Sequence, residues 1–157
     1  MLPYPAQNFF IPDIYCGKER NLIVMAMNDC IFCKIIKGDP PSRKLIETDH
    51  VIGILDTIPA IEGHCLIIPK RHVKYWNDMT YTETAQVFNA ARKVAKRMKN
   101  TLKPEYVCMF IRGGRVKHTH VVLFPSYNGD KVTGFPQSAL GTPDIDLDKL
   151  LEKLQEK

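Results

Sequence analysis

Short apolar, β-branched runs bounded by polar or turn residues recur along the chain and predict β-strands. Five strands are expected, over residues 44–48, 51–55, 64–68, 106–111 and 118–124. Short turns separate most neighbouring strands, and short connections favour antiparallel pairing. The pattern therefore predicts an antiparallel sheet.

Helical periodicity occurs in three places. Residues 30–37 carry an apolar stripe that predicts a short helix or turn before the breaker Gly38-Asp39-Pro40-Pro41. Thr80 and Glu83 have the spacing of a capping box, so we expect a helix that has Thr80 as its N-cap and runs to about Leu102. Its buried stripe is expected to consist of Val87, Ala91, Val94, Ala95, Met98 and Leu102. The last element is an amphipathic C-terminal helix with leucines at 147, 150, 151 and 154.

Strands, one long helix, two further strands and a terminal helix follow one another, and this order predicts an α+β fold in which helices cover an antiparallel sheet. With 157 residues, the chain is most simply one folded domain. We expect an irregular N-terminal extension over residues 1–27, the domain over residues 28–130, and a C-terminal tail and helix over residues 131–157. If Met27 is the natural start, the residues before it form a leader of unknown role.

Charge and cysteine content narrow the partners and the compartment. The 22 Lys+Arg residues exceed the 17 Asp+Glu residues by a formal charge of +5 and are scattered, which fits small anions and disfavours nucleic acid. The cysteines number five, and Cys65 and Cys108 lie in apolar settings, which argues against a disulfide framework and favours a reducing compartment, cytoplasmic or also nuclear. The apolar run Leu22–Met27 is too short for a membrane span or a signal-peptide core.

Two histidines begin the last predicted strand. In a strand, His118, His120 and Val122 share one face, so both imidazoles are expected to point the same way. Positive charge and exposed backbone amides beside paired histidines suit a phosphate ligand. The segment directly before the pair is expected to be flexible and is cationic. It contains Arg112, Gly113, Gly114, Arg115 and Lys117.

A second candidate for chemistry is the pair Cys30 and Cys33, separated by two residues. Two thiolates at this spacing can bind one metal ion, and a structural zinc site normally has four ligands. No second pair of this spacing follows, so the remaining ligands would have to be histidines. Spacing alone leaves a zinc site and two ordinary buried cysteines both open. A redox motif is disfavoured because the pair does not lie at the strand-to-helix turn of a βαβ unit.

Four segments, taken in order, resemble the histidine-triad (HIT) family. They are Cys30-Ile-Phe-Cys-Lys-Ile-Ile, Ile54-Leu-Asp56, Gly63-His-Cys-Leu-Ile-Ile-Pro-Lys-Arg-His72 and His118-Thr-His120, and the resemblance covers residues 28–127. It implies a homodimeric α+β domain that binds a purine nucleotide. In this family the middle histidine attacks the α-phosphorus and forms a covalent nucleotidyl-histidine, which water or another acceptor resolves. The resemblance therefore implies a hydrolase or nucleotidyl transferase acting on a phosphoramidate or dinucleoside polyphosphate.

Alignment on Pro125 puts the nucleophile at His120 and the third histidine of the family's triad at Val122. Valine cannot donate a hydrogen bond, so a catalytically weak or inactive module that binds a nucleotide or a partner is the alternative. The loop before the triad also differs from the family pattern. Gly113 and Gly114 occupy the positions of the family's glycine-glutamine pair, and Arg115 occupies a position where many members have serine or threonine. The loop cations either replace the missing donors by charge or are simply solvated.

The resemblance also implies a structural zinc ion, Zn²⁺. The ligands of zinc-binding members match Cys30, Cys33, His72 and His118. Such an ion would fix the strand that carries His120 and would favour a neutral ring there. A metal-free variant, in which His118 makes only backbone hydrogen bonds, is the alternative.

The remaining matches concern the nucleotide. Asp56 matches the carboxylate that accepts hydrogen bonds from the ribose hydroxyls, and the alternative is an aspartate that only caps a turn. His64 is expected to be structural. The apolar pocket for the base, or equally a plain core, matches Ile31, Phe32, Ile35 and Ile54.

Overall fold

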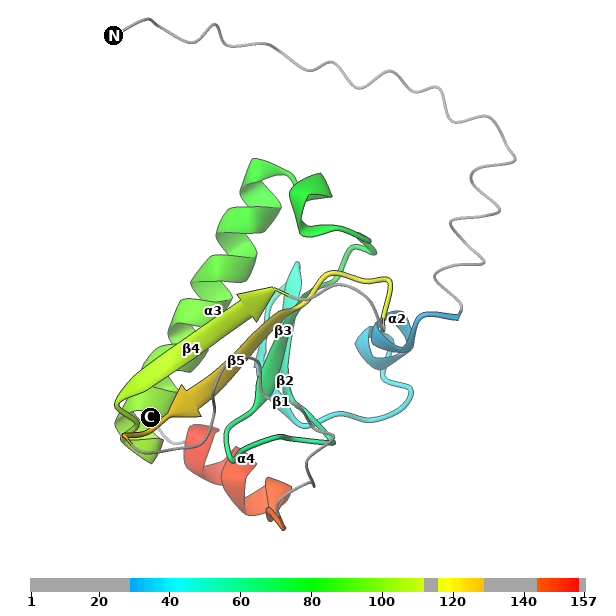
Figure 1. Ribbon diagram of the computed structural model, residues 1–157. Helices are drawn as coiled ribbons and strands as arrows, with labels where there is room; N and C mark the ends of the chain where they lie inside the picture. The colour runs from blue at the N-terminus through cyan, green and yellow to red at the C-terminus, as the bar shows by residue number, and fades with distance from the viewer. Residues whose placement is uncertain (1–28, 112–115, 129–143, 156–157) are drawn as a thin grey trace, which may run out of the picture.

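The computed structural model describes residues 29–111, 116–128 and 144–155 (Figure 1), so the predicted extension lies outside the described residues. The elements are α2 (Ile31–Ile36), β1 (Lys44–Glu47), β2 (Val51–Leu55), β3 (Cys65–Pro69), the 3-10 turn η1 (Trp76–Asp78), α3 (Tyr81–Leu102), β4 (Tyr106–Ile111), β5 (Val121–Ser126) and α4 (Leu147–Gln155). The strands form one sheet in the order β1-β2-β3-β5-β4, and every neighbouring pair is antiparallel. The predicted α+β class with an antiparallel sheet is confirmed.

The central strands β2, β3 and β5 are buried almost throughout, because helices cover both faces of the sheet. Alternate residues point to opposite faces, so each strand contributes to two clusters. The cluster on one face includes Val51, Ile67 and Val121 and packs on α3 and α4. The cluster on the other face includes Ile54 and Val122 and packs on the short helix α2. In Figure 1, α3 and α2 lie on opposite sides of the sheet.

The long helix α3 begins and ends as predicted. Thr80 is its N-cap, and the capping box is complete: the Glu83 N–H donates to Thr80 Oγ1 at 3.2 Å, and the Thr80 N–H donates to Glu83 Oε2 at 2.8 Å. The buried stripe differs slightly from the prediction, since Ala90 is buried while Ala95 and Leu102 are only partly buried. Neither α3 nor any other helix among the described residues is both long and apolar enough to cross a membrane.

The strand β5 begins three residues later than predicted, so His118 and His120 precede the strand instead of lying in it. The ladder with β3 stops at the pair Ile67 and Val121. Continued in register, it would place Thr119 opposite Pro69, and proline has no N–H to donate. The N–H of Thr119 donates instead to the carbonyl oxygen of Val73, at 2.6 Å.

Replacing Thr80 with alanine is expected to lower the free energy of unfolding by about 1 kcal/mol, because the substitution removes the side-chain half of the capping box. Urea unfolding followed by circular dichroism measures this. Thr82→Ala is the matched control, since Thr82 is exposed in the same first turn, and it should change stability by less than about 0.5 kcal/mol. An equal loss in both variants would contradict the role assigned to the cap.

Candidate functional site

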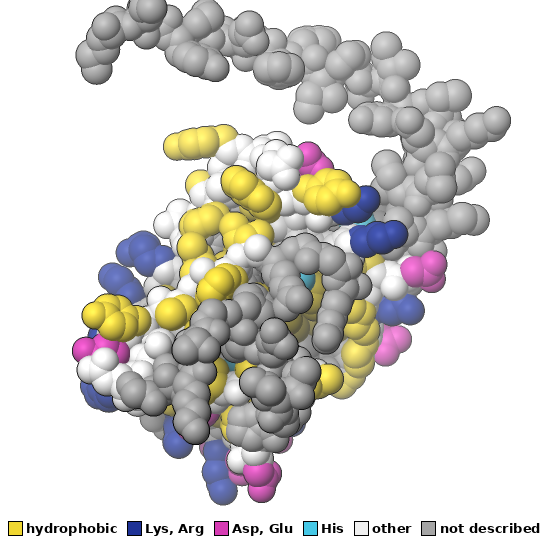
Figure 2. Space-filling model, in the orientation of Figure 1, with side chains coloured by type: hydrophobic (Ala, Val, Ile, Leu, Met, Phe, Trp, Pro, Cys, Tyr) yellow, Lys and Arg dark blue, Asp and Glu magenta, His cyan; other side chains and the backbone are white. Residues whose placement is uncertain are grey.

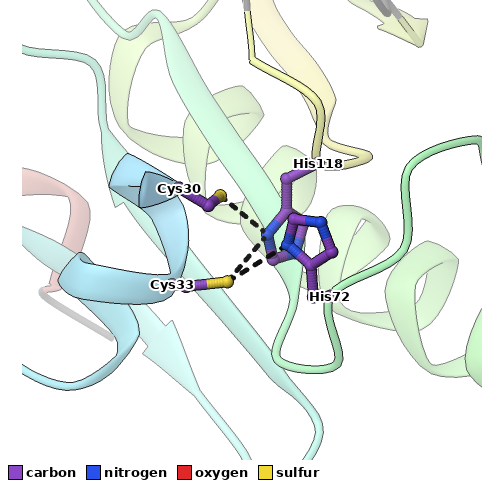
Figure 3. Close-up of side chains that lie close together, drawn as sticks. All are labelled: Cys30, Cys33, His72 and His118. Atoms are coloured by element: carbon purple, nitrogen blue, oxygen red, sulfur yellow. Dashed lines mark hydrogen bonds between the residues drawn. The ribbon is translucent and has the colours of Figure 1, made fainter. Parts of the chain in front are cut away.

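Four side chains from three separate segments meet at one end of the sheet (Figure 3). Cys30 is the N-cap of α2 and Cys33 lies inside this helix, while His72 follows β3 and His118 precedes β5. Their four candidate ligand atoms all lie within 4.8 Å of one another. The two cysteines and His118 are buried, and His72 is partly buried. The structure thus brings together all four residues predicted to bind zinc.

The spacing within this Cys₂His₂ cluster fits a zinc ion. The Sγ atom of Cys33 lies 3.2 Å from Nδ1 of His72 and 3.6 Å from Nδ1 of His118, and Cys30 Sγ lies 3.4 Å from the same His118 atom. Tetrahedral zinc with ordinary Zn–S and Zn–N bonds would separate sulfur and nitrogen ligands by about 3.6 Å. Two thiols and two imidazoles are also a common donor set of structural zinc sites.

The ring of His118 is oriented for metal binding. Its Nε2 atom lies 2.9 Å from the carbonyl oxygen of Pro69, and a carbonyl only accepts, so Nε2 carries the proton. The lone pair is then on Nδ1, which faces the two thiols. A backbone acceptor behind a metal-binding histidine is the usual arrangement. Burial lowers the pKa of His118 to about 4, and burial also lowers the pKa of His72, so both rings are neutral near pH 7.

The pKa of the Cys33 thiol is raised, whereas those of the two histidines are lowered. Burial, with a smaller contribution from neighbouring Cys30, raises the pKa of Cys33 to about 12. Without a metal ion this thiol therefore keeps its proton at neutral pH. A zinc ligand must be a thiolate, so binding has to displace the proton.

The candidate nucleophile His120 lies next to this cluster. Its Nδ1 atom is 2.9 Å from the main-chain carbonyl oxygen of His118, which assigns the proton to Nδ1 and a lone pair to Nε2. The ring of Phe32 contacts both imidazoles edge-on, with centroids 5.0 Å from His120 and 5.9 Å from His118. Both histidines therefore lie on the α2 side of the sheet.

The predicted base-pocket residues only partly come together. Phe32, Ile35 and Ile54 belong to the cluster under α2, and so does Val122, which is 3% exposed. Ile31 is not part of this cluster, and it is 40% exposed. The predicted phosphate-binding residues Gly113, Gly114 and Arg115 lie outside the described residues.

Asp56 caps a turn, as its alternative interpretation predicted, and it uses only one carboxylate oxygen for this contact. Its Oδ1 accepts the N–H of Ile58 at 2.9 Å, while Oδ2 lies 3.7 Å from Nε2 of His64. The sequence predicts only a structural role for His64. A histidine eight positions after an aspartate forms no motif, so the contact between His64 and Asp56 could not be predicted. The two side chains meet because β2 and β3 are joined by the loop between them.

Comparison with known proteins agrees with this geometry. The family model of the HIT domain matches residues 37–129. An adenosine 5′-monophosphoramidase of Candida albicans is 36% identical, over 82% of this chain and 90% of that protein. An uncharacterized HIT-like protein of Methanocaldococcus jannaschii is 30% identical, over 80% of this chain and 98% of that protein. A solved structure, the zinc-bound histidine triad family protein of Mycobacterium smegmatis, has a TM-score of 0.71 and 28% identity, over 82% of this chain and 92% of that one.

The fold and the clustered cysteines and histidines define a domain of the α+β class with a candidate zinc centre. The chain belongs to the histidine-triad (HIT) family, and its Cys₂His₂ cluster fits the zinc-binding branch of that family.

Zinc is expected to bind with a ratio of one ion per chain and to release about two protons at neutral pH, because two thiols become thiolates while the two histidines are already neutral. Affinity should therefore rise from pH 6 to pH 8. Calorimetric titration in two buffers with different ionisation enthalpies measures the proton count.

Two variants test the zinc ligands. Cys33→Ser should abolish tight zinc binding, whereas Cys108→Ser should leave it unchanged, because Cys108 lies on β4 outside the cluster. Zinc binding that is independent of pH, or that survives in Cys33→Ser, would contradict the assignment.

Proposed function

We propose that this protein is a nucleotide-binding hydrolase or nucleotidyl transferase that acts at the α-phosphorus of a purine nucleotide conjugate, with His120 as the nucleophile. One observation carries the proposal: the contact of His120 Nδ1 with the His118 carbonyl oxygen directs the lone pair to Nε2. Relatives from Candida albicans, Schizosaccharomyces pombe and Saccharomyces cerevisiae named adenosine 5′-monophosphoramidases support a phosphoramidate substrate. A dinucleoside polyphosphate is the other substrate that this chemistry would accept.

The proposed reaction has two displacements at phosphorus. The lone pair on Nε2 of His120 bonds to the α-phosphorus while the bond to the leaving group breaks. A leaving amine takes up a proton from water, whereas a leaving polyphosphate departs as an anion. A water molecule then attacks the same phosphorus and loses a proton. As the new P–O bond forms, the P–N bond breaks and its electrons return to Nε2 of His120. The carbonyl oxygen of His118 stabilises the positive charge that the ring gains in the first displacement, because it accepts a hydrogen bond from Nδ1–H throughout.

We propose that Cys30, Cys33, His72 and His118 hold a structural zinc ion. Bound there, the ion would hold α2 and the segments that carry His72 and His118 in one arrangement, and would thereby fix the position of the neighbouring His120 ring. The residues themselves tie α2 to the segments after β3 and before β5. Thiols must stay reduced to bind zinc, so we propose a reducing compartment such as the cytoplasm.

The nucleotide is proposed to bind on the α2 side of the sheet, beside His120. Asp56 would accept the ribose hydroxyls, because each oxygen of a carboxylate can accept more than one hydrogen bond. Gly113, Gly114 and Arg115 would meet the phosphate through backbone amides and positive charge. The base would contact the apolar side chains of Ile31, Phe32, Ile35 and Ile54.

A module that binds nucleotides with little or no catalysis is the second candidate function, and Val122 favours it. Its side chain is 3% exposed and packs in the apolar cluster under α2. Valine cannot donate a proton to a leaving group, and losing a general acid typically costs about 100-fold or more in rate.

A homodimer that pairs through β4 is also proposed. This strand is an edge of the sheet, and Tyr106 and Met109 on it are 67% and 45% exposed. Figure 2 shows hydrophobic side chains along the part of the surface where β4 lies in Figure 1. An apolar edge strand is a ready template for pairing with a second copy of the same strand.

Replacing His120 with alanine is expected to lower the rate of adenosine phosphoramidate hydrolysis by at least about 1,000-fold, because no other group would form the covalent intermediate. Release of AMP measured by chromatography gives the rate, and mass spectrometry after rapid acid quenching should detect the adenylylated wild-type chain. His50→Ala is the matched control, since His50 is exposed, and it should retain full activity. Equal rates in the wild type and His120→Ala would contradict the proposal.

Val122→His separates the two candidate functions. A wild-type rate that is already well above the uncatalysed rate and rises about 10- to 100-fold in the variant supports the enzyme. A wild type with no measurable turnover and no adduct, together with tight AMP binding, supports the binding module. Thermal unfolding must show that the variant is folded, because it places a polar ring in an apolar cluster.

A further inference from the structure

His64 carries a buried polar atom that the proposed chemistry does not use. The residue is 6% exposed, and its Nε2 atom has no hydrogen-bond partner within the part of the chain that the structure describes. A buried N–H without a partner costs free energy, because water bonds to it in the unfolded chain. An orphaned donor beside a candidate binding site is therefore a candidate for a contact that forms when the ligand binds.

The other ring nitrogen decides where the proton of His64 lies. The main-chain N–H of Ala60 donates to Nδ1 at 3.2 Å, so Nδ1 holds a lone pair. Burial lowers the pKa of His64 below its usual value, with Asp56 acting in the opposite direction and His120 in the same direction. A neutral imidazole has one proton, so Nε2 carries it and is a donor.

Main-chain hydrogen bonds within the loop between β2 and β3 hold His64 in place. The N–H of His64 donates to the Ile61 carbonyl oxygen at 3.0 Å, and the N–H of Asp56 donates to the His64 carbonyl oxygen at 3.1 Å. Gly63 has a φ of +93°, and a Cβ atom on it would lie 2.8 Å from a side-chain carbon of Leu102. Only glycine suits such a position, so the backbone before His64 is tightly constrained.

One carboxylate oxygen of Asp56 accepts a hydrogen bond, and the other lies just beyond hydrogen-bond distance of His64. Its Oδ1 accepts from Ile58 at 2.9 Å, whereas Oδ2 is 3.7 Å from Nε2 of His64. A shift of less than about 1 Å would bring that pair within hydrogen-bond distance. A carboxylate has about four lone-pair sites, so these two bonds would leave one site free on each oxygen. Two neighbouring acceptor sites match the two hydroxyls of a ribose.

We propose that His64 is a positioning residue for nucleotide binding: its Nε2–H donates to Oδ2 of Asp56 in the complex and holds this carboxylate against the 2′- and 3′-hydroxyls of the ribose. The inference rests on the proposed function, because it takes Asp56 as the ribose-binding residue. It adds that a histidine outside the triad selects ligands with an intact vicinal diol.

The test compares two ligands, AMP and 2′,3′-dideoxy-AMP, by calorimetric titration of the zinc-loaded protein. His64→Leu removes the donor and should weaken AMP binding about 10-fold while changing dideoxy-AMP binding by less than about 2-fold. His64→Gln can place an amide N–H near the position of Nε2 and should restore most of the AMP affinity. His50→Leu, at an exposed histidine, should leave both affinities unchanged.

Each remaining outcome is decisive. An equal loss for both ligands in His64→Leu, or no loss for either, overturns the positioning role and leaves the proposed function intact. A wild type that binds neither ligand, or binds both equally, contradicts the proposed ribose site, and the inference fails with it. If His64→Leu does not fold, His64→Asn replaces it, because an asparagine carbonyl can still accept from Ala60 while the Nε2–H is lost.

Discussion

The candidate site depends on His118, because three groups of this residue are engaged at once. Its Nε2–H donates to the carbonyl oxygen of Pro69, at the end of β3. Its Nδ1 faces the thiols of Cys30 and Cys33 on α2. Its own carbonyl oxygen accepts from His120. Since His118 is 0% exposed, water does not compete for these contacts, and a displacement of the residue would move the candidate nucleophile with it.

The early end of the β3–β5 ladder makes this convergence possible. The N–H of Thr119 is not used in a ladder and reaches across to Val73 instead. That bond helps to join the segment after β3 to the segment before β5, and the rings of His72 and His118 lie with their centroids 4.9 Å apart. Two ligands far apart in sequence are thus held side by side by backbone geometry. The thiols of α2 complete the cluster from the opposite side.

Local chemistry explains which features could be predicted from sequence. The bounds of α3 follow from the Thr80–Glu83 box, which depends on residues three apart. The start of β5 could not be found in this way, because it depends on Pro69, a partner residue some fifty positions earlier. The exposure of Ile31 likewise depends on how α2 packs, since a six-residue helix carries too few apolar positions to define its buried face. The zinc ligands were predicted by resemblance to known motifs and not by spacing alone.

Val122 has a consequence for the leaving group of the proposed reaction. An amine leaves with a conjugate-acid pKa of about 10 and needs a proton as its bond to phosphorus breaks. A terminal phosphate has a pKa of about 6 and can leave as an anion. A site whose third triad position is valine therefore loses more rate with a phosphoramidate than with a polyphosphate, because only the amine depends on a donor there. Under the proposed function, His120 would keep nucleophilic attack and the Asp56–His64 pair would keep ribose orientation. The identity of the leaving group would then determine how much rate the missing histidine costs.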